Sequence, residues 1–127
     1  MEWIVHDSNL GASPQPACRF YMTDKRIVLS TAGSREEAQK IARALVEKRL
    51  AACINILPRL ESVYRWQGKV ETAEEWLLVI KTTATAFPAL RDALRELHSY
   101  DVPECIMLSV EDGDAAYLGW LGESVQP

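Results

Sequence analysis

A few side chains in the sequence have the chemistry to bind a metal ion. Soft transition-metal ions prefer sulfur and imidazole ligands. The candidates in the patterned part of the chain are Cys53, Cys105, Met107 and His98, with Glu104 as a carboxylate ligand. No two of them have the spacing that metal ligands adopt on one helix or one hairpin. The spacing alone therefore predicts no preformed metal site.

Length, charge and cysteine content limit the architectures and partners that are possible. A chain of 127 residues favours one domain, and no apolar run approaches the roughly 20 residues that cross a bilayer. Acidic residues outnumber basic ones by 18 to 14, so the net charge of -4 disfavours nucleic-acid binding. Three cysteines without a C-x-x-C pair (Cys18, Cys53 and Cys105) fit a reducing compartment. We expect a cytoplasmic protein with neither a membrane nor a nucleic acid as partner.

The first 25 residues lack the pattern of a helix or a strand. Glu2 and Asp7 stand where a secretory signal would need positive charge and an apolar run. The sequence predicts a loosely ordered tail over residues 1–25 and a single folded domain over residues 26–127.

The domain begins with a strand and a helix. The apolar run at 27–29 predicts a buried strand. Ser34 and Glu37 form a capping box at the start of a helix over 35–48, whose apolar residues recur along one face.

A long hairpin follows, with arms at 53–66 and 69–83 and a turn at 67–68. Pro58 cannot donate to a strand ladder, so it places the first arm at a sheet edge or gives it a bulge. The run at 76–80 is apolar at every position, which predicts a central strand covered on both faces.

A second helix, a fourth strand and a short terminal helix complete the pattern. Thr85 is predicted to cap the second helix, a strand follows at 105–110, and Asp114 caps the last helix. The order β-α-β-β-α-β predicts an α+β fold of the ferredoxin-like kind, with two helices on one face of an antiparallel sheet.

The hairpin is too long for the helices that cover it. Each arm extends about 45 Å, although we expect interruptions at Pro58 and Ala73, whereas the first helix covers only about 20 Å. The overhang carries Val63, Tyr64 and Trp66, which are large apolar side chains on an exposed edge, and Trp76 is a further candidate. A closed, symmetric oligomer buries every copy of this overhang at once. We therefore expect the chain to self-associate.

Five motifs in order resemble the CutA divalent-cation-tolerance family, between about residues 26 and 121. They are A-A-C-I-N-I-L-P (51–58), Y-R-W-Q-G-K (64–69), I-K-T-T (80–83), L-H-S-Y-D-V-P-E (97–104) and Y-L-x-W-L (117–121). The resemblance implies a ferredoxin-like subunit that assembles into a homotrimer through its long hairpin. It also implies a cytoplasmic role in tolerance of copper and other divalent metals, without an established enzymatic reaction.

The resemblance also bears on the metal ligands. Where copper ligation is proposed in the family, the pattern has a cysteine near the end of the first strand and adjacent histidines before the Y-x-x-P-E segment. Ser30 and Leu97 stand at two of these positions, so only His98 remains. The candidate ligands for copper or another divalent cation are then His98, Glu104 and Cys53, with symmetry-related copies or neighbouring donors completing a site. No cofactor is expected to be needed for folding.

The resemblance further suggests that polar and aromatic residues of the motifs gather in clefts between subunits. They are Tyr64, Trp66, Lys81, His98, Tyr100 and Glu104. Such a cleft can bind a small anion, with Lys81 supplying charge and Trp66 a stacking surface. The same residues can instead form interface contacts, because tyrosine and tryptophan bury large areas while their polar tips stay bonded. Both interpretations remain open.

Three other classes of function fit the fold. An acylphosphatase-like enzyme needs a phosphate-cradling loop after the first strand, and residues 32–34 lack one, so we expect a non-enzyme. RNA recognition needs aromatic residues on the first strand, and residues 26–32 contain none. A trimeric small-molecule sensor or signalling scaffold resembling nitrogen-regulatory proteins stays as the alternative, with the hairpin tip as its contact surface.

Overall fold

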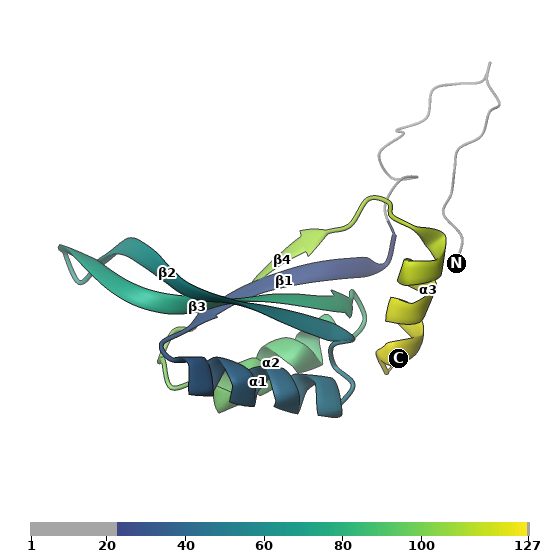
Figure 1. Cartoon of the computed structure of the whole chain (residues 1–127), viewed down its shortest axis with the longest axis horizontal. Helices are drawn as coiled ribbons and strands as arrows, with labels where there is room; N and C mark the ends of the chain where they lie inside the picture. Colours follow the sequence, from purple (N-terminus) through teal and green to yellow (C-terminus); the bar gives the residue numbers. More distant parts are fainter. Residues whose placement is uncertain (1–22, 127) are drawn as a thin grey trace, which may run out of the picture.

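The computed structural model describes residues 23–126, which fold into one antiparallel sheet and three helices (Figure 1). The sheet order is β2-β3-β1-β4. Helices α1 and α2 lie together on one face of the sheet, and α3 stands at the end opposite the hairpin tip. The ferredoxin-like prediction is confirmed. The elements are β1 Lys25–Ala32, α1 Arg35–Glu47, β2 Cys53–Trp66, β3 Lys69–Thr83, α2 Phe87–Leu97, β4 Ile106–Ser109 and α3 Ala115–Ser124.

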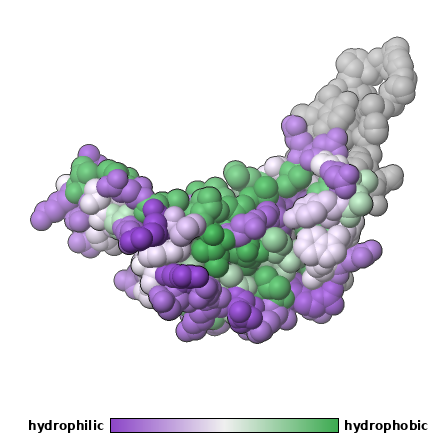
Figure 2. Space-filling view, in the orientation of Figure 1, coloured by the Kyte–Doolittle hydropathy of each residue, from purple (hydrophilic) through white to green (hydrophobic). Residues whose placement is uncertain are grey.

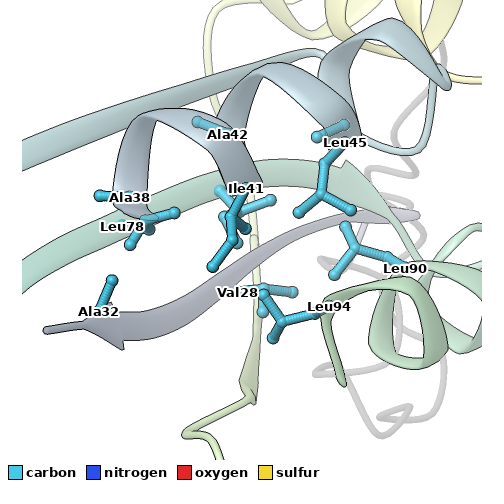
Figure 3. Packing of buried hydrophobic residues seen from close by; sticks show 11 residues of the cluster. Val28, Ala32, Ala38, Ile41, Ala42, Leu45, Leu78, Leu90 and Leu94 are labelled. Atoms are coloured by element: carbon cyan, nitrogen blue, oxygen red, sulfur yellow. The ribbon is translucent and has the colours of Figure 1, made fainter. Parts of the chain in front are cut away.

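The core lies between the sheet and the two helices. Side chains of α1 point down towards β1 and β3, where those of α2 meet them (Figure 3). Burying each large aliphatic side chain contributes roughly 1.5–3 kcal/mol. The fully buried members are Val28, Ala32, Ala38, Ile41, Leu45, Leu78, Ile80, Leu90 and Leu94.

The helix starts follow local capping rules in two cases out of three. Ser34 accepts a hydrogen bond from the Glu37 amide and Asp114 from the Tyr117 amide, as predicted. The prediction that Thr85 caps α2 is wrong. The Thr83 hydroxyl accepts from the Ala86 amide at 3.2 Å, since β3 continues to Thr83 and brings that side chain to the helix start.

The hairpin has both of the features that Pro58 predicts, an edge strand and a bulge. β2 lies at an edge of the described sheet, and its register with β3 skips one residue between Leu57 and Leu60. Arg59 within this bulge has a left-handed φ of 56°. The predicted interruption at Ala73 is wrong, because Ala73 pairs in register with Ser62.

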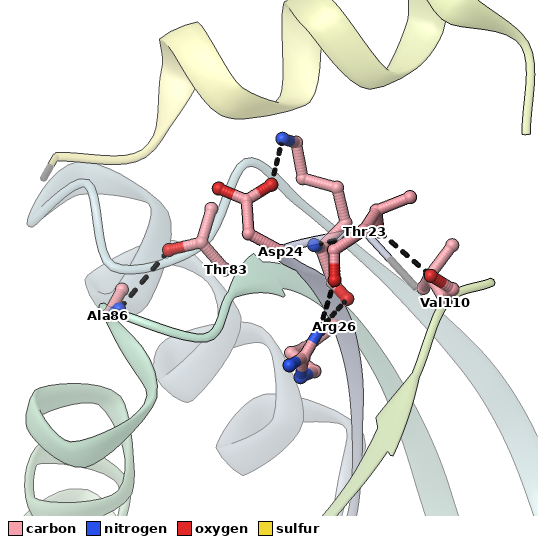
Figure 4. A network of polar contacts seen from close by, with 7 residues as sticks. Thr23, Asp24, Arg26, Thr83, Ala86 and Val110 are labelled. Carbon is pink, nitrogen blue, oxygen red and sulfur yellow. Dashed lines mark hydrogen bonds and ion pairs between the residues drawn. The ribbon is translucent and has the colours of Figure 1, made fainter. Parts of the chain in front are cut away.

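The start of β1 is held by local polar contacts and by one contact to Val110, which follows β4 (Figure 4). The Thr23 hydroxyl donates to the Val110 carbonyl at 2.8 Å, and the Arg26 guanidinium donates to the Thr23 and Lys25 carbonyls. The predicted tail lies almost entirely outside the described residues.

The second face of the sheet is not covered by helices α1 and α2. In β3, Leu78 and Ile80 are buried under the helices, whereas Leu77 and Val79 point to the other face and stay half-exposed. The prediction that this strand is covered on both faces therefore does not hold within the described chain, where only one face of β3 is covered. In β4, Ile106 is 50% and Leu108 45% exposed. A band of hydrophobic surface runs across the middle of the molecule in Figure 2. We call the face that carries these residues the open face.

Among residues 23–126, no helix has the length and apolar character needed to cross a membrane.

Candidate functional site

A cavity of about 620 Å³ lies between the hairpin and the loop that joins α2 to β4. We call it the cleft. Four of the six residues predicted for a cleft line it: Tyr64, Trp66, Tyr100 and Glu104. The remaining lining residues are Thr31, Ser62, Val63, Glu75, Asp101 and Val102.

Tyr100 and Glu75 form the hydrogen-bonded centre of the cleft. The Tyr100 hydroxyl donates to Glu75 Oε2 at 2.7 Å, and Glu75 is only 8% exposed. Burial and this contact with a carboxylate raise the pKa of Tyr100 well above its ordinary value. A Cβ on Gly33 would lie 3.1 Å from the Tyr100 hydroxyl oxygen, so glycine lets the ring lie close to the chain.

Glu75 was not identified from the sequence. The signal that marks it is a carboxylate in alternation with Leu77 and Val79, which puts a charge on the apolar open face of β3. A buried carboxylate on such a face is expected to have a specific partner. The Tyr100 hydroxyl is the partner that the structure provides.

His98 is buried behind the cleft and uses both ring nitrogens. Nε2 lies 2.7 Å from the Thr31 carbonyl oxygen, and Nδ1 accepts from the Tyr100 amide at 3.1 Å. The contacts assign the neutral tautomer protonated on Nε2. Glu37 lies 3.5 Å from Nδ1, but an ion pair would require a proton on the nitrogen that accepts from Tyr100. His98 thus has no free lone pair for a metal and instead positions Tyr100.

Glu37 ties the α2–β4 loop to the first turn of α1. Its carboxylate accepts from the Ser99 amide at 2.7 Å. Burial by itself raises the pKa of Glu37, but the hydrogen bonds from Ser99 outweigh it, so the pKa is lowered overall. Glu37, whose amide donates to the N-cap Ser34, therefore also fixes the loop that carries the cleft residues.

Glu104 is the second carboxylate of the cleft. Burial, and then the neighbouring charge of Glu75, raise its pKa above the ordinary value of 4.5. Neutralising this side chain relieves an electrostatic cost, and so does a cation bound beside it.

In metal-free protein, Glu104→Gln is expected to raise thermal stability at about pH 7 and to leave it unchanged at about pH 4. The folded state holds the proton of Glu104 more tightly than the unfolded chain does. Below its unfolded pKa, the Glu104 carboxyl therefore does not lower the free energy of unfolding. As the pH rises through the raised pKa, the charged carboxylate lowers that free energy increasingly. Thermal unfolding of both proteins at the two pH values checks this, and an equal shift at both would contradict it.

Lys81 and Cys53 lie at the other end of the sheet. They are register partners, with Lys81 Nζ 3.9 Å from Cys53 Sγ and also bonded to Asn55 Oδ1. Lys81 also pairs with Ile27, four residues along β1 from Thr31 in the cleft, which is about 13 Å. Lys81 therefore supplies no charge to the cleft of its own chain.

The other predicted soft ligands are also dispersed. Cys105 packs against the core, and burial raises the pKa of its thiol, which disfavours the thiolate that binds metals. Ser30 is fully buried on the helix-covered face. The part of the chain that the structure describes contains no group of three His, Cys, Asp or Glu side chains that could hold a metal ion. The predicted trio His98, Glu104 and Cys53 is not brought together within one chain.

The charge of the cleft favours a cation over an anion. Glu75, Asp101 and Glu104 line it together with three aromatic rings, and its described lining includes no lysine or arginine. An anion here would face carboxylates at short range, whereas a cation would be attracted to them and to the aromatic faces.

Residues 26–124 match the family described as "CutA1 divalent ion tolerance protein". The chain is 51% identical over 100 residues to the divalent-cation tolerance protein CutA of Thermus thermophilus, covering 79% of this chain and 97% of that one. It is 48% identical over 91 residues to human protein CutA, covering 72% of this chain and 51% of the human one. The chain thus spans about half the length of the human relative.

Solved structures agree with these sequence matches. The Thermus thermophilus structure titled "Divalent cation tolerance protein (Cut A1)" has a TM-score of 0.79 at 50% identity and covers 80% of this chain and 99% of its own. The structure from Archaeoglobus fulgidus, titled "Periplasmic divalent cation tolerance protein CutA", has a TM-score of 0.78 at 39% identity. The match covers 80% of this chain and 99% of that chain.

Proposed function

Because the chain belongs to the CutA1 divalent ion tolerance protein family, we propose that it acts in divalent-cation tolerance as a homotrimer whose clefts bind a cation. The observation that carries this proposal is the carboxylate pair of Glu75 and Glu104 in an aromatic-walled cavity whose described lining has no basic residue. The names of the relatives, which refer to divalent-cation tolerance, agree with this role.

Trimer formation is supported by the open face and the hairpin. Leu77, Val79, Ile106 and Leu108 present a contiguous apolar surface on one side of the sheet, and Trp66 at the hairpin end is 48% exposed. A surface of this kind on a stable protein marks an interface. Three copies related by a threefold axis form a closed ring, in which each copy buries this apolar surface.

The cation is held by oxygen donors in this proposal. Glu75 and Glu104 supply carboxylates, and the chemistry of such donors suits harder divalent ions better than Cu(I). The described part of one chain does not provide a complete ligand set, because His98 is fully hydrogen-bonded and Cys53 lies outside the cleft. A neighbouring copy and water complete the site, which makes binding dependent on assembly. Copper binding through His98 and Cys53 is not supported by this arrangement.

The test is cation binding by the Glu104→Gln variant. Metal-free protein is titrated calorimetrically with Mn²⁺, Zn²⁺ and Cu²⁺, and the variant is expected to bind at least about tenfold more weakly because a charge-assisted contact is lost. Glu111→Gln is the matched control, since Glu111 is exposed and outside the cleft. Equal affinities for the two variants would contradict the proposal.

The same proposal places the protein in a reducing compartment such as the cytoplasm and gives it no catalytic reaction. Cys53 and Cys105 are free thiols among the described residues, which agrees with such a compartment. His98, the histidine that the structure describes, is buried and bonded to backbone partners.

A signalling scaffold is the second candidate, favoured by the exposed apolar hairpin end. Val63 is 64% and Val70 65% exposed there. Hydrogen exchange of the assembled protein separates the two candidates. Protection of the hairpin end means that neighbouring copies cover it, and rapid exchange leaves it available to a partner.

A further inference from the structure

A second cavity, of about 540 Å³, lies on the opposite face of the hairpin from the cleft. Trp76, Glu74 and Ile56 project to the helix-covered side of the sheet, because they alternate with the residues of the open face. The cavity lies between the first turns of α1 and the β-bulge, and we call it the bulge cavity. Its lining consists of Arg35, Gln39, Ile56, Pro58, Arg59, Glu74 and Trp76.

The bulge cavity has the reverse charge of the cleft. Two guanidinium groups, of Arg35 and Arg59, and the Gln39 amide line it beside one carboxylate, that of Glu74. Arg59 Nε lies 3.3 Å from Glu74 Oε2, and both side chains are more than half exposed. An exposed pair of this kind contributes little to stability, so a stronger anion can displace Glu74.

Both arginines occupy positions that the local backbone does not favour. Arg35 is the first residue of α1, where the helix dipole repels a cation. Arg59 takes a left-handed φ of 56° without being glycine. Neither side chain gains burial, because both residues are exposed. Arg59 gains only its exposed pair with Glu74 in return, and residues that break local rules in this way are expected at binding sites.

We propose that the bulge cavity binds a phosphate monoester that carries a planar ring. Arg35 and Arg59 hold the phosphate from two elements, which suits a group with three outward oxygens better than a carboxylate with two. The ring lies against Trp76, which with Ile56 and Pro58 forms the apolar wall of the cavity. A cavity of this volume is typical of small-ligand sites.

The test is calorimetric titration of the full chain in its native assembly with adenosine 5′-monophosphate. Binding is expected in the micromolar to millimolar range, with adenosine and inorganic phosphate each at least about tenfold weaker. Arg35→Gln and Arg59→Gln are expected to weaken binding about tenfold or more. Gln is chosen at position 59 because Gln67 already adopts a positive φ in this chain.

Glu74→Gln gives the result that separates a binding site from a structural role. Removing the competing carboxylate is expected to strengthen nucleotide binding about two- to fivefold. Arg43→Gln, an exposed arginine on the same helix and outside the cavity, is the control and leaves binding unchanged. No binding of the nucleotide, equal binding of adenosine, or an Arg35→Gln variant that behaves like Arg43→Gln would overturn the proposal.

Discussion

Val79→Lys is expected to convert the assembled protein into monomers. Val79 lies in the middle of the open face, between Leu29 of β1 and Asn55 of β2 in register. A lysine there would have to be buried against apolar side chains of a neighbouring copy, at a cost of several kcal/mol per copy. Because each copy in a closed ring carries the change, the cost recurs at every interface. Size-exclusion chromatography with light scattering measures the mass of the particles.

The matched control is Val46→Lys on the outer side of α1. Val46 is 38% exposed and lies on the helix layer, away from the open face. Lysine is favourable near a helix C-terminus, so this variant should keep both the fold and the assembly. Circular dichroism confirms that each variant is folded. A folded Val79→Lys variant that keeps the mass of the wild type would show that the open face is not the interface.

His98→Ala is expected to lower the free energy of unfolding by about 2–4 kcal/mol, because it leaves the Thr31 carbonyl and the Tyr100 amide without partners in the interior. Denaturant unfolding measures the loss. The same measurement at saturating cation tests whether His98 is a ligand.

If His98 only positions Tyr100, the wild type and the variant differ by the same free energy with and without cation. A metal ligand would behave differently, since cation would stabilise the wild type far more than the variant. If cation increases the difference in unfolding free energy between wild type and His98→Ala by more than about 1.4 kcal/mol, which is tenfold in affinity, His98 is a metal ligand.

The fold was predictable from the sequence where short-range rules determine the structure. The caps at Ser34 and Asp114 and the bulge at Pro58 follow from hydrogen-bonding groups within a few residues. Thr85 failed as a cap because the start of α2 depends on how far β3 extends, which is set by pairing with β1. Propensity within a window does not contain that information.

The sequence predicted which types of residue form the candidate site, but it predicted less well which of them lie together. Tyr64, Trp66, Tyr100 and Glu104 meet in one cleft. Lys81 shares the open face with Glu75 but lies six residues further along β3, about 20 Å away.

The role of His98 was not accessible from sequence. Its two partners are backbone groups, the Thr31 carbonyl and the Tyr100 amide, and a side-chain pattern does not mark them. The importance of Glu75 depends in turn on a tyrosine that is 25 residues away in sequence.

The most direct test of the assembly is the mass of the wild-type particle in dilute solution. Light scattering or native mass spectrometry is expected to give about 43 kDa, three times the 14.3 kDa of one chain. A folded, soluble particle of 14.3 kDa would mean that the open face and the hairpin are stable in water. That result would contradict the trimer and the shared clefts that depend on it.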